Sequence, residues 1–498
     1  MERLNYQTLE QLGNKDYVLK DAPERVLQFG EGNFLRGFVD YFIDVLNEKK
    51  GFNSKVVVVQ PIAQGLAEML NEQEGLYTLY LRGFEKGEKV NARRLISCIH
   101  RAINPYADPE AFLENAKNPD LRFIVSNTTE AGITYVAGDQ LEDAMPSSFP
   151  AKLTKLMYER FKAFGTEKGK GFVILSCELI DNNGAELKKC VEKYAESWNL
   201  GEAFKAWLDA ENIFCSTLVD RIVTGYPRNE AAELCAENGY EDRLLDTAEV
   251  FGFWVIEGPQ SLYDELPIQG TDLPIMITDD HTPYKKRKVR ILNGAHTSMV
   301  LAAYLAGQNI VRECMHDDTI VSFMSKTLFD EIIPTLTLPE EELMSFAQAT
   351  IERFKNPFID HALLAISLNS VSKWRARVLP SMKGYVEKFG KLPEHMAFSF
   401  AALMAFYTGT EIREGALIGT RQGEEYKICD DMPVLEYCAA NSTTLSVEEF
   451  VTGFASNEAF FGEDLTKYEG FVETVATYLS VIRTDGMRKV LEDLVKGE

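Results

Sequence analysis

Short runs of apolar residues recur through the first half of the chain, and each is followed by glycine or polar residues. Runs of this length are typical of strands buried on both faces of a sheet, with helices covering each face. We therefore expect strands within 25–29, 55–59, 75–83, 122–126, 171–176, 251–256 and 274–277. The alternating run 75–83 is expected to return as a hairpin through 85–88.

The pattern changes after about residue 279. Apolar residues now recur with the period of long helices, expected over 288–306, 317–335, 340–353, 358–379, 393–406, 446–459 and 466–496. This change predicts two domains, an α/β domain over 1–279 and a mainly α-helical domain over 280–498.

The first expected strand ends at a glycine-rich turn, Gly30-Glu31-Gly32, and an amphipathic helix follows to about Asn47. Strand, glycine turn and helix open a dinucleotide-binding unit, where bare main-chain N–H groups meet a pyrophosphate. The spacing is G-x-G-x-x-x-x-G, with Leu35 at the place of the usual third glycine, so the generic fingerprint is a weak match. A tight turn that binds no ligand stays open as the alternative.

Gln60 follows the second expected strand, where an acidic residue usually accepts hydrogen bonds from the adenosine ribose. Pro61 comes next, and no arginine directly follows to bind the 2′-phosphate of NADP. The residues alone leave NAD and NADP open, and the missing arginine favours NAD.

A run of cations from Lys285 to Arg290 leads into an apolar helix that carries Asn293 and His296. Residues three apart lie about 60° apart around a helix, so the amide and the imidazole face one place. Lys288 stands at the start of this helix. An amine, an amide and an imidazole around one spot suit acid–base chemistry on a carbonyl or alcohol. The plainer alternative is a buried helix behind a solvated basic turn.

Composition and charge exclude several classes of binding partner. A net charge of −24 argues against binding nucleic acid, whose phosphates need a basic face. The chain has no run of 18 apolar residues and its start lacks the apolar stretch of a signal peptide, so we expect a cytoplasmic protein with no membrane partner. The cysteines show no C-x-x-C spacing and the histidines no H-x-x-x-H pair. We therefore expect reduced thiols and no metal site.

Several strings, in order, resemble signatures of the mannitol dehydrogenase family of polyol-specific long-chain dehydrogenases. Residues 288–296 read K-V-R-I-L-N-G-A-H, similar to the family's K-x-R-x-L-N-x-x-H, and 30–36 fit its G-x-G-x-F-x-R. Residues 176–184 fit S-C-x-x-x-x-x-N-G, 219–222 read V-D-R-I, and a Thr/Glu/Gly-rich turn stands at 128–132. The resemblance implies a Rossmann-type α/β N-terminal domain plus a mainly α-helical C-terminal domain, with the active site in the cleft between them.

The resemblance also implies catalytic roles. In this family the lysine is the acid/base, the asparagine of the same helix holds the carbonyl oxygen, and the histidine positions the substrate. These roles fall on Lys288, Asn293 and His296. An earlier asparagine completes a two-amide cradle for the oxygen, and that role falls on Asn183.

Substrate and cofactor contacts are implied in the same way. The family's V-D-R-I stretch lies at the floor of the active site, which points to Asp220, although buried Asp–Arg pairs are often structural. The family's D-G-S-x-R is matched loosely, with Lys373 at the arginine place. Lys373 and Arg377, four apart on one helical face, could hold a carboxylate, or be solvated cations near a helix end. The implied cofactor-binding residues are Phe29, Gly30, Gly32, Asn33, Phe34, Arg36, Gln60, Asn127, Thr128, Thr129 and Glu130.

We therefore expect an NAD-dependent oxidoreductase that exchanges hydride with a small sugar acid. Within the family, the strings at 28–36, 126–133 and 292–297 resemble members that act on sugar acids. A sibling acting on another ketose acid or on fructose is the first alternative. A nucleotide-sensing protein that keeps the fold without catalysis is the second. The sequence predicts neither the oligomeric state nor the direction used in the cell.

Overall fold

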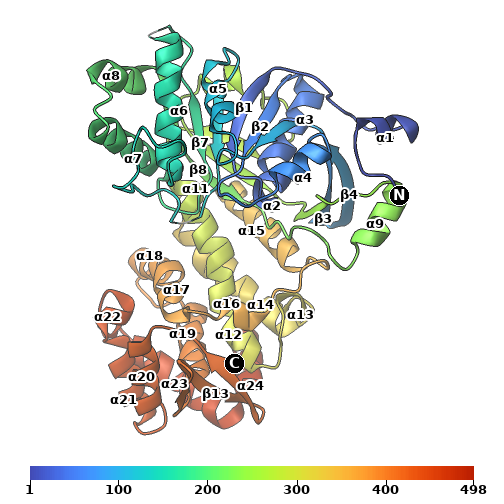
Figure 1. Cartoon of the computed structure of the whole chain (residues 1–498). Helices are drawn as coiled ribbons and strands as arrows, with labels where there is room; N and C mark the ends of the chain where they lie inside the picture. The colour runs from blue at the N-terminus through green and yellow to red at the C-terminus, as the bar shows by residue number, and fades with distance from the viewer. Residues whose placement is uncertain (130, 166, 498) are drawn as a thin grey trace. The chain divides into compact units, whose positions relative to one another are not determined.

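The computed structural model describes residues 1–129, 131–165 and 167–497. The chain forms two compact units, unit 1 with residues 1–82 and 89–281, and unit 2 with residues 83–88 and 282–498 (Figure 1). The boundary expected from the sequence, after residue 279, lies two residues before the start of unit 2 proper. Each unit is described by itself, and the expected cleft stays a prediction.

Unit 1 is built on an eight-stranded sheet with the order β11-β10-β8-β7-β6-β1-β2-β5. Its strands are β1 (Glu24–Phe29), β2 (Lys55–Val59), β5 (Ile99–Ile103), β6 (Phe123–Ser126), β7 (Val173–Ser176), β8 (Ile213–Asp220), β10 (Phe253–Glu257) and β11 (Ile275–Thr278). Neighbouring strands are parallel except β10, which runs antiparallel to β8. The α/β prediction is confirmed, and β5 and β8 are strands that it missed.

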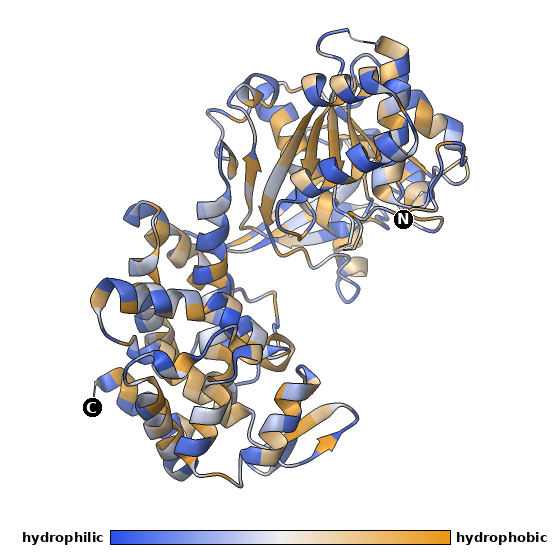
Figure 2. Ribbon diagram, turned by 90° about the vertical axis from the view of Figure 1, so that its left-hand side faces the viewer, coloured by the Kyte–Doolittle hydropathy of each residue, from blue (hydrophilic) through white to orange (hydrophobic). Residues whose placement is uncertain are grey.

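Both faces of this sheet are buried, which is why the strands read as unbroken apolar runs. Val26, Val56 and Val125 face one core together with α3 (Val39–Lys50). Their neighbours along the strands face a second core, formed with α6 (Phe149–Phe164), α7 (Asn183–Ser197) and α8 (Glu202–Glu211). Figure 2 shows the strands as an apolar centre between helices of mixed colour. Burying each Val or Leu side chain contributes about 1.5–3 kcal/mol.

A second sheet in unit 1 has the order β4-β3-β9. Its strands are β3 (Tyr77–Glu85), β4 (Glu88–Ile96) and β9 (Asp246–Glu249), and the hairpin return between β3 and β4 is as expected. The remaining helices of unit 1 are α1 (Tyr6–Gln11), α2 (Asn33–Gly37), α4 (Ala67–Glu72), α5 (Pro109–Glu114), α9 (Ala231–Asn238) and α10 (Leu262–Glu265).

Unit 2 is mainly helical, as predicted. Its first continuous helix comprises α11 (Thr282–Arg287), a π-helical turn (Lys288–Asn293) and α12 (Gly294–Leu305). It continues with α13 (Val311–Cys314), α14 (Asp318–Lys326), a second π-helical turn (Thr327–Ile332), α15 (Glu340–Phe354), α16 (Leu363–Ile366), α17 (Ser370–Arg377), α18 (Leu379–Phe389), α19 (Glu394–Phe406), α20 (Met432–Asn441), α21 (Val447–Ala455), α22 (Glu458–Phe461), α23 (Phe471–Asp485) and α24 (Met487–Lys496). The buried helices α12 and α19 pack together at its centre.

Three expected helices of unit 2 are wrong in extent. The helix expected over 446–459 divides into α21 and α22. The helix expected over 358–379 is replaced by α16 and α17, because Asn369 takes a left-handed backbone conformation, with φ of 53°, that ends one helical path and begins another. The helix expected over 466–496 divides into α23 and α24 at Gly486, where φ is 85°. The sequence patterns also missed a small sheet of β12 (Ile412–Arg413), β13 (Ala416–Arg421) and β14 (Glu424–Ile428).

Within the described ranges, no helix has both the length and the apolar character needed to cross a bilayer. The eight cysteines are all free thiols, and Cys429 is the exposed one. The expected reduced thiols therefore agree with the structure, although not all of them lie in a core.

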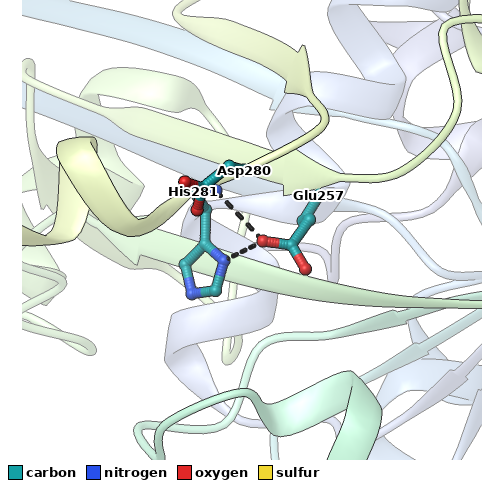
Figure 3. Close-up of side chains that lie close together, drawn as sticks. All are labelled: Glu257, Asp280 and His281. Atoms are coloured by element: carbon teal, nitrogen blue, oxygen red, sulfur yellow. Dashed lines mark hydrogen bonds and ion pairs between the residues drawn. The ribbon is translucent and has the colours of Figure 1, made fainter.

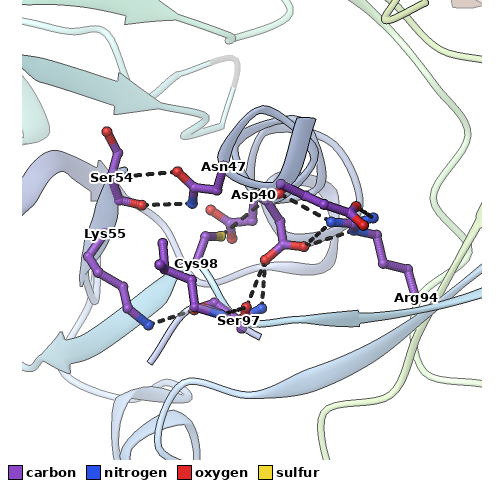
Figure 4. Close-up of polar contacts among 10 residues, drawn as sticks. Asp40, Asn47, Ser54, Lys55, Arg94, Ser97 and Cys98 are labelled. Carbon is purple, nitrogen blue, oxygen red and sulfur yellow. Dashed lines mark hydrogen bonds and ion pairs between the residues drawn. The ribbon is translucent and has the colours of Figure 1, made fainter. Parts of the chain in front are cut away.

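Polar side chains of α3 bind Ser54, Arg94 and Ser97 on the neighbouring segments (Figure 4). Asp44 accepts hydrogen bonds from the main-chain N–H of Ser97 and pairs with Arg94 at 2.6 Å. Asp40 accepts a 3.1 Å hydrogen bond from Gln28 through Oδ2, while its buried Oδ1 has no partner. Burial raises the pKa of Asp40 to about 7. The carboxyl is therefore a buried group that favours its neutral form.

We expect Asp40→Asn to stabilise the protein, and more so at high pH. The folded pKa of Asp40 lies above its ordinary value of 3.8, so the unfolded chain ionises first and stability falls as pH rises from about 4 to about 7. Asparagine cannot ionise, so the variant does not lose this part of the free energy of unfolding. The difference amounts to up to a few kcal/mol, at about 1.4 kcal/mol per pKa unit. Thermal unfolding at about pH 5 and pH 8 measures it, with the exposed Asp21→Asn as control. A gain that does not grow with pH would contradict the buried-acid account.

Candidate functional site

A groove of about 750 Å³ opens in unit 1 at the carboxyl ends of β1 and β6. Loops at the carboxyl ends of parallel strands are where α/β proteins bind nucleotides. The groove is lined by Gly30, Glu31, Gly32, Pro61, Ile62, Gln64, Asn127, Thr128, Thr129, Ala131, Gly132, Thr134, Val136, Ser147, Ser148, Phe149 and Lys152. Five of the predicted cofactor-binding residues, the two glycines and residues 127–129, are therefore part of one wall.

The glycine loop leaves its main chain open toward the groove. Gly30 has φ of +125°, a conformation that side chains other than glycine rarely adopt, and an added Cβ would come within 3.2 Å of Leu35. A Cβ on Gly32 would meet nothing within 4 Å, so the space beside it is empty of protein atoms. Bare backbone beside open space at this edge fits the close approach of a dinucleotide pyrophosphate.

Other predicted cofactor-binding residues stand behind the groove and fix its shape. Arg36 is 2% exposed, and its guanidinium donates to the main-chain oxygens of Glu31 and Leu244 and to Asn33 Oδ1. These bonds use the guanidinium to hold the glycine loop, and leave no part of it along the groove wall. Arg36 and Asn33 therefore act as a brace for the loop in this structure.

Of the two predicted phenylalanines, Phe29 is a core residue and Phe34 is half-buried and packs against the core. Phe29 is 1% exposed and packs between the rings of Phe112 and Phe149, at centroid distances of 5.9 and 4.9 Å. Phe34 stacks on Phe38 at 5.0 Å. Neither ring lines the groove, so both place the loop through packing.

The loop after β6 is held by an acid that the sequence reasoning missed. Glu178, 2% exposed, accepts hydrogen bonds through Oε1 from both the N–H and the hydroxyl of Thr128, and through Oε2 from Ser126. Asn127 donates to the main-chain oxygen of Cys177 at 2.6 Å. The available signal was an acid two residues after the strand 173–176. Predicted Glu130 lies outside the described residues.

Asn183 does not fit the oxyanion role predicted for it. Its amide nitrogen donates to the main-chain oxygens of Glu178 and Thr217 at 2.9 and 3.0 Å. Its Oδ1 accepts from the N–H groups of Gly184 and Thr217. Both amide hydrogens are thus committed to main-chain carbonyls, and none remains for a substrate oxygen. In this structure Asn183 joins the start of α7 to β8.

Asp220 is the last residue of β8 and is 6% exposed. Its neighbour Arg221 donates to the main-chain oxygens of Phe251 and Gly37 and lies over the ring of Tyr41 at 4.9 Å. This part of the V-D-R-I stretch is therefore structural. The substrate contact predicted for Asp220 stays a prediction.

In unit 2, Lys288 and Asn293 are the first and last residues of the π-helical turn that interrupts α11 and α12. Single π-helical turns inside α-helices occur frequently at functional sites, because the extra residue changes where side chains point. Asn293 is half-buried, and none of the described side chains or main-chain groups bonds its amide. Its hydrogen-bonding capacity is available to a ligand.

His296 lies one turn further along, in α12. Its ring stacks on Phe354 at 4.0 Å and meets His361 edge-on at 5.6 Å, while its buried Nε2 has no hydrogen-bond partner. Burial lowers the pKa of His296 well below its usual range, and the nearby charges of Arg353 and Arg377 lower it further. The imidazole is therefore neutral, with one ring nitrogen unused.

Lys373 and Arg377 bring positive charge beside this histidine. Lys373 Nζ donates to the main-chain oxygen of Ile366 at 2.8 Å, and Arg377 donates to the hydroxyl of Thr297 at 3.4 Å. Within 1–129, 131–165 and 167–497 neither cation pairs with a carboxylate. Burial lowers the pKa of both, and the charge of Arg377 further lowers that of Lys373. His361, which the sequence reasoning missed, is a further member of this cluster, and burial lowers its pKa.

Glu257, Asp280 and His281 form a group that could in principle bind a metal ion (Figure 3). Glu257 Oε2 accepts from both the main-chain N–H of His281, at 3.0 Å, and its ring Nδ1, at 2.5 Å. These bonds join Glu257 to His281 and close the turn after β11. We assign the group no metal, and the expected absence of a metal site stays a prediction.

Models of one family match nearly the whole chain. The mannitol dehydrogenase Rossmann domain matches residues 24–270, and the mannitol dehydrogenase C-terminal domain matches residues 280–483. Two relatives are named altronate oxidoreductase. That of Klebsiella pneumoniae (strain 342) is 48% identical over 492 residues, and that of Escherichia coli O7:K1 (strain IAI39 / ExPEC) is 47% identical over 492 residues. Each alignment covers 98% of this chain and 100% of the relative.

Solved structures agree on the fold. A Pseudomonas fluorescens mannitol 2-dehydrogenase, in ternary complex with NAD and D-mannitol, has a TM-score of 0.68 at 23% identity, with 100% of both chains covered. A D-sorbitol dehydrogenase in substrate-free form has a TM-score of 0.77 at 22% identity, covering 98% of this chain and 100% of that one. The family resemblance seen in the sequence strings is confirmed, and the chain belongs to the mannitol dehydrogenase family.

Proposed function

We propose that this chain is an NAD-dependent oxidoreductase that interconverts D-tagaturonate and D-altronate. Full-length relatives at 47–48% identity that are named altronate oxidoreductase support altronate as the substrate. The mannitol 2-dehydrogenase whose structure holds NAD supports the cofactor, together with the open glycine loop of the groove in unit 1.

The observation that carries the choice of substrate is the pair Lys373 and Arg377. Two partly buried cations, four residues apart on α17, are costly unless an anion neutralises them. Among the described residues neither forms an ion pair with a carboxylate, and the charge of Asp430 offsets the lowered pKa of Lys373 only in part. In a chain of net charge −24, a sugar acid would otherwise be repelled. The cations therefore supply the local attraction that an acid substrate needs, and a neutral polyol would leave them unpaired.

Lys288 is the proton carrier in this proposal. A nicotinamide cofactor bound beside the glycine loop of Gly30 and Gly32 would supply the hydride for reduction of the ketone carbon and would accept it on oxidation. On reduction the ammonium of Lys288 gives its proton to the ketone oxygen, so that an alcohol forms. On oxidation the neutral amine takes that proton. Asn293, whose amide is available, donates a hydrogen bond to the same oxygen as negative charge develops there.

His296 orients the substrate. Because its imidazole is neutral, its unpartnered Nε2 can exchange a hydrogen bond with a sugar hydroxyl without adding charge. The stacked ring of Phe354 fixes the plane of the imidazole. Asn183 is given a positioning role in place of the predicted oxyanion role: it holds the loop after β7 against β8.

Replacing Lys288 by alanine is expected to lower turnover by at least about a hundredfold, since general acid–base catalysis contributes about 10²–10⁴ in rate. NADH binding, followed by nicotinamide fluorescence, should stay nearly unchanged because the groove in unit 1 is untouched. Lys286→Ala, at an exposed position two residues earlier, is the control. A Lys288→Ala protein that keeps most of its activity would refute the assigned role.

Substrate choice can be tested with tagaturonate, fructuronate and fructose as oxidants of NADH. Wild type should prefer tagaturonate, and Lys373→Met or Arg377→Met should raise KM for the uronates about tenfold or more while leaving weak activity on fructose unchanged. Arg375→Met, exposed on the same helix, serves as control. Preference for fructose in wild type, or equal losses on all three ketoses, would argue against carboxylate binding by these cations.

Asn183→Ala is expected to lower the free energy of unfolding by roughly 2 to 4 kcal/mol, since four buried hydrogen bonds to main-chain groups are lost. Thermal unfolding measures the effect, and Lys189→Ala, exposed on α7, should change little. If the variant kept its unfolding temperature and lost only turnover, Asn183 would be an oxyanion donor after all.

A further inference from the structure

In dinucleotide-binding folds an acid usually follows the second strand and binds the adenosine ribose. The residue after β2 in this chain is not an acid. Gln60 stands where that acid usually follows the strand, and its side chain is already occupied. Its Nε2 donates to the main-chain oxygen of Ile62 at 2.8 Å, and its Oε1 accepts from the N–H of Ala67 at 3.2 Å. The amide thus closes the turn after β2 and is 3% exposed, so the ribose needs another acceptor.

An acid does reach this place, from the neighbouring strand. Glu31 belongs to the glycine loop after β1, and β1 pairs with β2 in parallel, with Phe29 opposite Val59. The Glu31 side chain is 7% exposed, and its Oε1 accepts a 3.3 Å hydrogen bond from the N–H of Leu66. It therefore crosses from β1 to the turn that follows β2.

The second oxygen of this carboxyl is unused. Glu31 Oε2 is buried and has no hydrogen-bond partner, and the residue lines the groove together with Pro61, Ile62 and Gln64. Among the described residues that line the groove, Glu31 is the one acid and Lys152 the one base. A buried acceptor without a donor is unfavourable by itself, and a pair of ribose hydroxyls would satisfy it.

We propose that Glu31 accepts the hydroxyl groups of the adenosine ribose and excludes a 2′-phosphate, in place of an acid after β2. This inference rests on the dinucleotide cofactor of the proposed function. The carboxylate and a phosphate on the same ribose carbon would repel each other in a buried site, whereas a free hydroxyl donates to the carboxylate. Selection of NAD over NADP then comes from the glycine loop.

Lys152, a base that lines the groove, is not available to bind the 2′-phosphate of NADP. Its Nζ donates to the main-chain oxygen of Ser147 at 2.7 Å and lies 5.1 Å from the ring of Tyr106, while burial lowers its pKa to about 8. The amine is committed to closing the loop before α6. Lys152 would favour NADPH only if it bound the 2′-phosphate. In that case the wild-type protein would bind NADPH at least as tightly as NADH.

Glu31→Gln tests the inference, because glutamine keeps the shape and the bond to Leu66 but removes the charge. We expect NADH affinity to fall about tenfold or more and NADPH affinity to fall less or rise, so that the ratio of the two dissociation constants narrows about tenfold. Both constants come from titration followed by nicotinamide fluorescence. Glu68→Gln, exposed on α4, is the matched control, and Glu31→Ala provides a second way to remove the charge.

The outcomes are separable. A narrowed ratio in both Glu31 variants, with wild-type values in Glu68→Gln, supports the assignment. Equal loss for the two nucleotides would mean that Glu31 only holds the turn, and would overturn it, as would a wild-type protein that binds NADPH as tightly as NADH. A wild-type protein that binds neither nucleotide would overturn the proposed cofactor itself, and the role of Glu31 with it.

Discussion

Hydrogen bonds from buried side chains to main-chain groups are the constraint on which the nucleotide groove depends. The sheet supplies stability, and polar contacts fix the loops at its edge. Arg36 holds the glycine loop, Gln60 closes the turn after β2, and Glu178 ties down the loop after β6. Each side chain satisfies polar groups that would otherwise be buried without partners, so the loops have one favoured arrangement.

In unit 2, by contrast, polar groups near His296 are not all satisfied by protein partners among the described residues. Around His296, within the described residues, a buried ring nitrogen lacks a hydrogen-bond partner, and Lys373 and Arg377 form no ion pair with a carboxylate. Such groups reduce stability unless a ligand completes them, which is why unpaired buried groups with shifted pKa values gather at functional sites. This contrast distinguishes residues that stabilise the fold from residues that are available to bind a substrate.

The sequence predicted the elements whose signal is local. Strands of the large sheet are continuous apolar runs, and the signature around Lys288 is contiguous, so both could be read from the chain. β5, β8 and β9 were missed because they are short or interrupted by polar residues, as at His100 and Arg101 in β5 and at Ser216 and Thr217 in β8. The break at Asn369 could not be predicted, since a left-handed residue between two helices leaves the helical period on each side intact.

Roles were harder to predict than places. Asn183 matched a family motif, yet its amide is used by four main-chain bonds that only the folded arrangement of β7, α7 and β8 creates. Phe29 and Arg36 lie in the right loop but brace it from behind. The converse holds for Glu178 and His361, which carry no motif and are brought to the sites by strand order and by the path of the chain before α16.

Gly65 shows how two distant positions come to depend on each other. A Cβ at this residue would overlap both the carboxylate of Glu31 and the side chain of Gln60, so no larger residue can stand there while those two keep their places. A larger residue can therefore stand at position 65 only if positions 31 and 60 change with it. An attempt to redirect the cofactor preference by altering the turn after β2 alone, as one would in a dehydrogenase with its acid on that strand, would meet this steric coupling first.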